Sequence, residues 1–209
     1  PDGYLPAVAE VCRRHGVLLV CDEVVTGVGR MGSWTASERY GVQPDLMTLA
    51  KVLTSGYQPL GAVVVSGAVA EPFFDREGAW LKHGYTYSGH ATACAAAIAN
   101  LDIIEEERLV ERVAALEPTL PRLLGPLADL DAVEEVRSAG LLAAVQLDAG
   151  WFEERDAAPA RVADEMRRHG QLTRLLACGA LQFSPPFITT EEQVAEFAEA
   201  VAASLAAFA

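Results

Sequence analysis

The sequence predicts an α/β layer fold, in which helices alternate with short buried strands, followed by a smaller α+β domain. Three apolar, strand-like runs lie within residues 17–66, and segments with helical spacing precede the first run and separate it from the second. From about residue 117 onward, the expected order of elements becomes strand, strand, helix, strand, strand, helix. The predicted domains are therefore residues 1–116 and residues 117–209.

In the first domain, residues 5–15 have helical spacing and end at Gly16, a residue type that commonly terminates helices. Residues 17–21 form a continuous apolar run with β-branched residues, which is typical of a strand buried on both faces. The other elements expected before residue 90 are a short helix over 34–40 and strands over 45–50 and 61–66.

A long helical region is expected over residues 92–124, with breaks near Pro118 and Pro121 because proline interrupts a helix interior. The second domain then follows. Its expected elements are strands over 132–137 and 141–147, a helix over 159–169, strands over 172–176 and 181–184, and a helix after Thr190.

The composition argues against several classes of function. The 209 residues include 16 Lys and Arg against 29 Asp and Glu, a net charge of −13, so a nucleic-acid partner is not expected. No apolar run approaches the ~20 residues of a membrane helix. The four cysteines lack zinc or C-x-x-C spacing and are expected to be small buried hydrophobes in a cytoplasmic protein. Because the chain opens at Pro1 without Met, we expect part of a larger protein.

Gly27, Gly29 and Gly32 have the G-x-G-x-x-G spacing of a dinucleotide-binding loop. Such a loop should lead into a long helix, and an acidic residue should end the next strand. Here only the short segment SWTASERY follows before Gly41, and the next strand ends at Lys51. The context therefore argues against a dinucleotide site.

Asp22 and Lys51 each follow an apolar strand, and ligands of open α/β sheets collect at such strand ends. Taken alone, Asp22 is more simply a helix cap or an ion partner of Arg30, and a lone lysine usually reaches toward water. A carboxylate and an amine at two strand ends of one sheet, however, describe a chemical site. An amine in a low-dielectric cleft becomes a nucleophile toward aldehydes.

Three stretches carry a family resemblance: LLVCDEVVTGVGR, PDLMTLAKVLTSGYQPLGAVVVS and HGYTYSGHATACAAAIAN. In this order and spacing they resemble the class III (omega) aminotransferases, pyridoxal-phosphate enzymes of fold type I, and the likeness continues to SPPFITTEEQ. It implies part of a mostly parallel large-domain sheet plus the small C-terminal domain. The family's large domain begins well upstream of Pro1, so the resemblance implies a C-terminal fragment.

The resemblance also implies roles for individual residues. Lys51 would form a Schiff base with the aldehyde of pyridoxal 5′-phosphate, and Asp22 would pair with the protonated pyridine nitrogen. Val24 would lie against the ring face, since strand residues two apart point to one side. Tyr85, through its backbone, and Thr86 would contact the cofactor phosphate of a neighbouring subunit, which implies a homodimer with shared active sites.

By its own chemistry, the GYTYSGH run is an anion site before a helix, or simply a helix start capped by Ser88 or Thr92. His90 is interpreted as structural. Arg174 is either a surface charge at a strand edge or, by the resemblance, the residue that grips the substrate carboxylate. Gln182 and Val25 replace the arginine and glutamine of the ornithine-like and 4-aminobutyrate-like branches, so the omega-amino-acid:pyruvate branch is favoured.

The function implied is transfer of an amino group from an amine or omega-amino acid to a keto acid such as pyruvate. Two alternatives stay open. One is an aminomutase or decarboxylase of the same family, and the other is an inactive truncated chain that only associates with a partner. No nucleic acid, membrane or metal is expected to take part.

Overall fold

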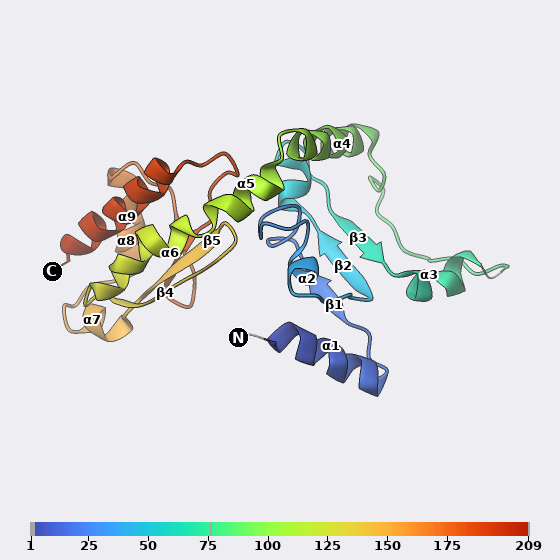
Figure 1. Cartoon of the computed structure of the whole chain (residues 1–209), viewed down its shortest axis with the longest axis horizontal. Coiled ribbons are helices and arrows are strands. Elements are labelled where there is room, and N and C mark those ends of the chain that lie inside the picture. The colour runs from blue at the N-terminus through green and yellow to red at the C-terminus, as the bar shows by residue number, and fades with distance from the viewer. Residues whose placement is uncertain (1–2, 76, 209) are drawn as a thin grey trace. The chain divides into compact units, whose positions relative to one another are not determined.

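The computed structural model describes residues 3–75 and 77–208, which fall into two compact units, Pro1–Glu111 and Arg112–Ala209 (Figure 1). Each unit has its own sheet, with strand orders β1-β2-β3 and β4-β5-β7-β6. The domain boundary after residue 116 stays a prediction. Among the described residues, no helix is long and apolar enough to cross a membrane.

The first unit opens with α1 (Tyr4–His15), which ends at Gly16 in the left-handed conformation, as predicted. Its sheet contains β1 (Val20–Asp22), β2 (Leu46–Leu49) and β3 (Ala62–Val65). β1 pairs parallel with β2, whereas β3 pairs antiparallel with β2. The three strands predicted from apolar runs are confirmed. The described sheet has one parallel and one antiparallel pair of strands.

The expectation that the first strand is buried on both faces is wrong for the described chain. Val17, Leu18 and Val20 each expose more than half of their surface. Val63 and Val64, which are adjacent on β3 and so point to opposite faces of the sheet, are also exposed. An apolar run of this kind requires a layer on each side of the sheet, and the described elements of this unit cover both faces only in part.

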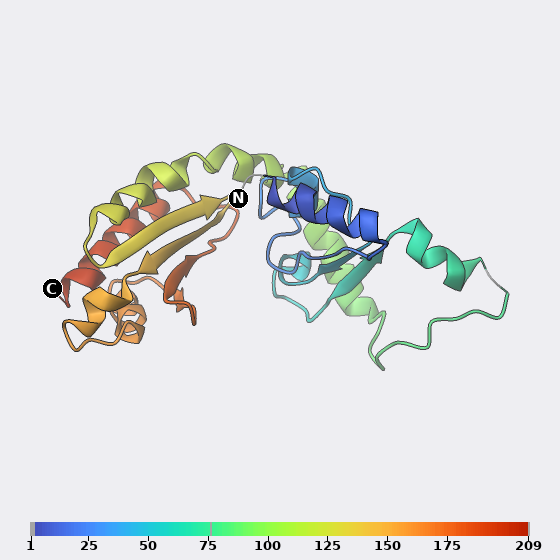
Figure 2. The same cartoon turned by 90° about the horizontal axis from the view of Figure 1, so that it is seen from below.

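The other elements of the first unit are short except for one. They are α2 (Ala36–Arg39), the 3₁₀ turn η1 (Lys51–Thr54), α3 (Gly67–Phe74), α4 (Ala91–Glu106) and the first part of α5 (Leu109–Leu116). The sequence predicted α2 and α4 but neither η1 nor α3. Figures 1 and 2 show α3 extending away from the sheet, and residues 77–90 form a long irregular segment that leads to α4.

The helical region expected over residues 92–124 consists of α4, α5 and α6 (Thr119–Leu124). Pro118 stands at the N-cap of α6, so the break predicted there is confirmed. The break predicted at Pro121 is wrong, because Pro121 lies in the first turn of α6, where its missing N–H has no helical partner to lose. A further break, unsignalled by any proline, separates α4 from α5.

The second unit has a four-stranded antiparallel sheet. Its elements are η2 (Gly125–Asp129), β4 (Val133–Ala139), β5 (Leu142–Leu147), α7 (Ala149–Glu153), α8 (Ala160–Arg168), β6 (Arg174–Leu175), β7 (Ala180–Phe183) and α9 (Glu191–Ala206). All were predicted except η2 and α7. α9 begins with a capping box between Thr190 and Gln193.

One face of this second sheet forms a core with the helices, and the other face stays open. Val145 and Leu181 are fully buried on the inner face, where α6, α8 and α9 pack. The rings of Phe183 on β7 and Phe197 on α9 lie 4.4 Å apart, centroid to centroid. Because side chains alternate along a strand, the neighbouring position Gln182 points to the open face.

The cysteines are less buried than expected. Cys12, Cys21 and Cys94 are partly exposed and Cys178 is exposed, and all four are free thiols. Cys12 lies on α1, a helix without a buried residue, and Cys178 lies in the turn between β6 and β7. Their apolar sequence surroundings were therefore a poor guide to burial.

Candidate active site

The structure brings Asp22 and Lys51 together at the same end of two adjacent strands. Asp22 is the last residue of β1 and pairs in register with Thr48 of the parallel strand β2. Lys51 begins the turn η1, two residues after β2 ends. The two side chains are close enough for the positive charge of Lys51 to contribute to the lowered pKa of Asp22.

The carboxylate of Asp22 is held through one of its two oxygens. Oδ1 accepts hydrogen bonds from the backbone N–H of Val24 at 3.1 Å and from the hydroxyl of Thr48 at 2.9 Å. The hydrogen bond from Val24 lowers the pKa of Asp22 most, followed by the bond from Thr48 and then by the attraction of Lys51. Oδ2 accepts no hydrogen bond within the described chain, and the side chain is exposed.

Val24 does not lie on the strand as the sequence interpretation assumed. β1 ends at Asp22, and Val24 begins the turn that follows. The alternation of strand side chains therefore does not extend to Val24. Its placement beside Asp22 comes from the backbone hydrogen bond, and its side chain is half-buried.

Lys51 has an unusual backbone conformation, with φ of 46°. A residue with a Cβ pays about 1–2 kcal/mol to adopt this left-handed conformation. Non-glycine residues held in such conformations cluster at functional sites. The side chain is exposed, and its amine makes no hydrogen bond or ion pair with the rest of the described chain.

Asn100 of α4 holds the turn that carries Lys51. Its Nδ2 donates to the carbonyl oxygen of Val52 at 2.7 Å, and its Oδ1 accepts from the hydroxyl of Ser55 at 2.6 Å. No sequence pattern predicted a role for Asn100. The available signal was a single amide side chain within the otherwise Ala-rich and apolar segment ATACAAAIANL.

Glu23, the second acid of the pair, is structural. It is only 3% exposed and accepts hydrogen bonds from the backbone N–H groups of Ala36 at 2.9 Å and Ser37 at 2.6 Å. The hydroxyls of Thr26 and Ser37 also donate to it. Burial acts to raise the pKa of Glu23, but the hydrogen bonds outweigh it and the pKa is lowered. Glu23, and not Asp22, thus accepts the first N–H groups of α2, whose N-cap residue is Thr35.

The glycines of the loop serve its backbone. A Cβ on Gly27 would lie 2.8 Å from the backbone oxygen of Glu23, and Gly29 and Gly32 adopt positive φ values of 96° and 70°. The loop leads into α2, which has four residues rather than the long helix of a dinucleotide site. The structure thus agrees with the argument against a dinucleotide.

Tyr85 and Thr86 lie in the exposed segment before α4. The backbone N–H of Tyr85 donates to the hydroxyl of Ser88 at 2.8 Å, so it is already engaged within a turn. The helix is capped by His90, whose Nδ1 accepts from the backbone N–H of Ala93, and not by Ser88 or Thr92 as considered above. No hydrogen bond joins Tyr85 or Thr86 to Asp22 or Lys51 in the described chain.

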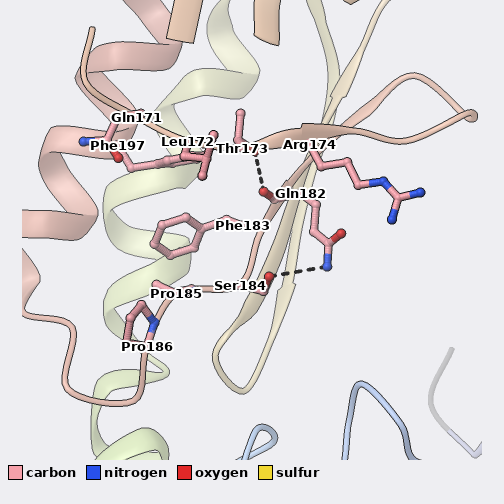
Figure 3. Close-up of a pocket in the computed structure, with 10 residues that line it drawn as sticks. All are labelled: Gln171, Leu172, Thr173, Arg174, Gln182, Phe183, Ser184, Pro185, Pro186 and Phe197. Carbon is pink, nitrogen blue, oxygen red and sulfur yellow. Dashed lines mark hydrogen bonds between the residues drawn. The ribbon is translucent and has the colours of Figure 1, made fainter. Parts of the chain in front are cut away.

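Arg174 lies in the second unit, at a cavity of about 520 Å³ (Figure 3). It pairs across the strands with Gln182, and Figure 3 shows both side chains on one side of the sheet, with the ring of Phe183 on the other. Gln182 donates to the hydroxyl of Ser184 at 3.4 Å. The guanidinium of Arg174 makes no hydrogen bond or ion pair with the described residues and is exposed.

The groups at the first site fit the two ends of a pyridoxal phosphate ring. An unpaired amine suits the cofactor's aldehyde, and a carboxylate with one open oxygen suits a protonated ring nitrogen. Hydroxyls that suit the phosphate, on Thr86 and Ser88, stand in the exposed segment before α4, and no hydrogen bond joins them to this pair in the described chain.

Comparison with known proteins supports this interpretation. Residues 1–205 match the family Aminotransferase class-III. Omega-aminotransferase of Caulobacter vibrioides is 38% identical over 96% of this chain and 46% of the relative. Beta-alanine--pyruvate aminotransferase of Pseudomonas aeruginosa is 35% identical over 98% of this chain and 46% of the relative. The chain spans about half the length of the curated relatives it matches.

A solved structure of an amine transaminase from an uncultivated Pseudomonas species, in its PLP-bound form, is 40% identical. It matches with a TM-score of 0.90 over 100% of this chain and 49% of that chain. The predicted fold class, fold type I, is therefore confirmed, as is the resemblance stated from the motifs. The chain belongs to the class III aminotransferases, a family of pyridoxal-phosphate-dependent enzymes.

Proposed function

We propose that this chain is part of a pyridoxal-phosphate-dependent transaminase that moves an amino group from an amine or omega-amino acid to a keto acid such as pyruvate. The proposal rests on two groups at the ends of adjacent strands. One is the amine of Lys51, which makes no hydrogen bond or ion pair with the described residues, and the other is the carboxylate of Asp22, whose Oδ2 accepts no hydrogen bond there. The resemblance to a beta-alanine--pyruvate aminotransferase supports the choice of substrates.

The roles proposed for the residues follow from their chemistry. The amine of Lys51 would hold the cofactor at its aldehyde carbon and would also serve as the base that moves a proton at the substrate's α-carbon. Asp22 would accept the N–H of the protonated ring nitrogen, and its lowered pKa keeps it ionised for this task. Val24 would lie against the ring face. The bound cofactor supplies an electron sink for the charge that develops at the α-carbon.

The proposal predicts that Lys51 is the residue modified when the 209-residue chain is incubated with pyridoxal phosphate and reduced with borohydride. The sequence has two lysines, Lys51 and Lys82, so the experiment has an internal control. Lys82 lies over the ring of Trp80, at 5.3 Å from its centroid. Peptide mass spectrometry should find the label on Lys51, and Lys51→Ala should reduce total labelling by about tenfold or more.

Lys82→Ala is the matched control and should keep the label. Equal labelling of both lysines, or no labelling of the unmodified chain, would contradict the assignment of Lys51 and remove the main support for a transaminase.

We further propose that Arg174 binds the substrate carboxylate. Support comes from its unpaired guanidinium at the cavity of the second unit, since a guanidinium binds a carboxylate through two hydrogen bonds. In a transaminase assay, Arg174→Ala should raise the KM for beta-alanine by about 10- to 100-fold. This is the loss of affinity expected when hydrogen bonds to a charged group are removed. The KM for an amine without a carboxylate should not change, and a parallel rise would count against this role.

The partner we propose is a second copy of the chain, in a homodimer with shared active sites in which Tyr85 and Thr86 contact the neighbour's cofactor phosphate. The exposed segment before α4 supports this, because Trp80, Tyr85 and Tyr87 are each 69–80% exposed. Sedimentation equilibrium should show a dimer that Trp80→Asp weakens. Leu172→Asp, at an 85% exposed position of the second unit, is the control, and equal effects of both would contradict this interface.

We also propose that the protein works in the cytoplasm, since all four cysteines are free thiols, as a reducing compartment requires. Fractionation of the source cells tests this, and recovery of the protein outside the cytoplasm would overturn it.

A further inference from the structure

Thr48 is the polar member of an otherwise apolar strand and stands directly beside Asp22. β2 consists of Leu46, Met47, Thr48 and Leu49, and the parallel register pairs Thr48 with Asp22 of β1. In-register residues of neighbouring parallel strands point to the same face of the sheet. The hydroxyl of Thr48 therefore reaches the carboxylate of Asp22, to which it donates at 2.9 Å.

This hydrogen bond affects which oxygen of Asp22 is available. The backbone N–H of Val24 donates to the same oxygen, Oδ1, at 3.1 Å. An exposed carboxylate otherwise turns freely about its last torsion. Two donors from different segments hold it in one orientation, so that Oδ2 alone is left to accept a further hydrogen bond.

We propose that Thr48 is a positioning residue of the cofactor site, which orients Asp22 so that its free oxygen faces the protonated ring nitrogen of pyridoxal phosphate. The inference rests on the function proposed above, in which Asp22 is the partner of that nitrogen. The hydroxyl is the part of Thr48 that matters, because a valine has the same shape and the same preference for strands but cannot donate.

The test uses the 209-residue chain and two measurements. The first is the titration of the Asp22 carboxyl carbon by ¹³C NMR in the cofactor-free chain, assigned with Asp22→Asn. The second is the dissociation constant for pyridoxal phosphate, measured by equilibrium dialysis. The variants are Thr48→Val, which removes the hydroxyl, and Thr48→Ser, which restores it. Lys51 stays in every variant, so its attraction for Asp22 is constant.

Thr119→Val is the matched control. Thr119, in the second unit, also donates its hydroxyl to a carboxylate, that of Glu191 at 3.1 Å. Its replacement should leave both measurements unchanged, which separates loss of the Thr48 hydroxyl from a general effect of exchanging threonine for valine.

We expect Thr48→Val to raise the pKa of Asp22 toward its ordinary value of 3.8 and to weaken pyridoxal phosphate binding by about three- to tenfold, the effect of one hydrogen bond. Thr48→Ser should restore both. If Asp22 titrates in Thr48→Val as it does in the unmodified chain, the inference is overturned. It is also overturned if the titration of Asp22 shifts but the affinity for pyridoxal phosphate does not change. If the unmodified chain binds no pyridoxal phosphate, the function proposed above fails. The titration then decides by itself whether Thr48 orients Asp22.

Discussion

Replacing Glu23 with alanine is expected to lower the free energy of unfolding of the first unit by about 2–6 kcal/mol. The carboxylate is buried and joins the end of β1 to the start of α2 through the N–H groups of Ala36 and Ser37. Alanine would leave these two donors without an acceptor, and each buried, unpaired donor costs about 1–3 kcal/mol. Denaturant-dependent hydrogen exchange of residues 17–40 measures the change within this unit.

Glu10→Ala is the control for the loss of a carboxylate. Glu10 pairs with Arg13 on the exposed surface of α1, and such pairs contribute only about 0–1 kcal/mol. If Glu23→Ala were no more destabilising than Glu10→Ala, Glu23 would not be the structural acid that its hydrogen bonds indicate.

The same residue predicts a pH dependence. The pKa of Glu23 is lower in the folded chain than its ordinary value of 4.5. Its contribution to stability is therefore complete above pH 4.5 and is lost as the pH falls through the lowered, folded pKa. The difference in unfolding free energy between the unmodified chain and Glu23→Gln should be largest at neutral pH and should shrink on acidification. A constant difference would contradict this linkage.

Gly27→Ala should destabilise the same loop by about 2–3 kcal/mol, through overpacking. A Cβ at Gly27 would lie 2.8 Å from the backbone oxygen of Glu23 and 2.8 Å from Cδ2 of Leu49. The leucine can rotate away, but the backbone oxygen cannot move without breaking its own hydrogen bond from Gly27 N–H at 2.9 Å. The loop follows Asp22 directly, so binding of pyridoxal phosphate should weaken together with stability.

Gly67→Ala provides the comparison. No atom lies within 4 Å of a Cβ placed on Gly67, which is the first residue of α3, so alanine should be neutral or slightly stabilising there. Equal effects at Gly27 and Gly67 in chemical denaturation would show that the close approach at Gly27 is not what requires a glycine.

Much of the secondary structure was predictable because its signals are local. Gly16 ends α1 through its positive φ, and Thr190 with Gln193 begins α9 through a capping box. Failures arose where local signals depend on a partner. The apolar run that begins at Val17 predicts burial, yet only the surrounding layers decide it, and the described layers cover β1 and β3 in part.

The sequence by itself predicted the two groups that we propose to be reactive at the candidate site. Asp22 and Lys51 each follow an apolar run, and the ends of adjacent parallel strands lie at one edge of a sheet. The tertiary structure alone decided how these groups are held. It placed Thr48 beside Asp22 through strand register, Asn100 of α4 against the turn of Lys51, and the left-handed conformation on Lys51 itself. Periodicity along a chain reports which face of an element is apolar. Contacts between residues distant in sequence depend on register and packing, which no local pattern encodes.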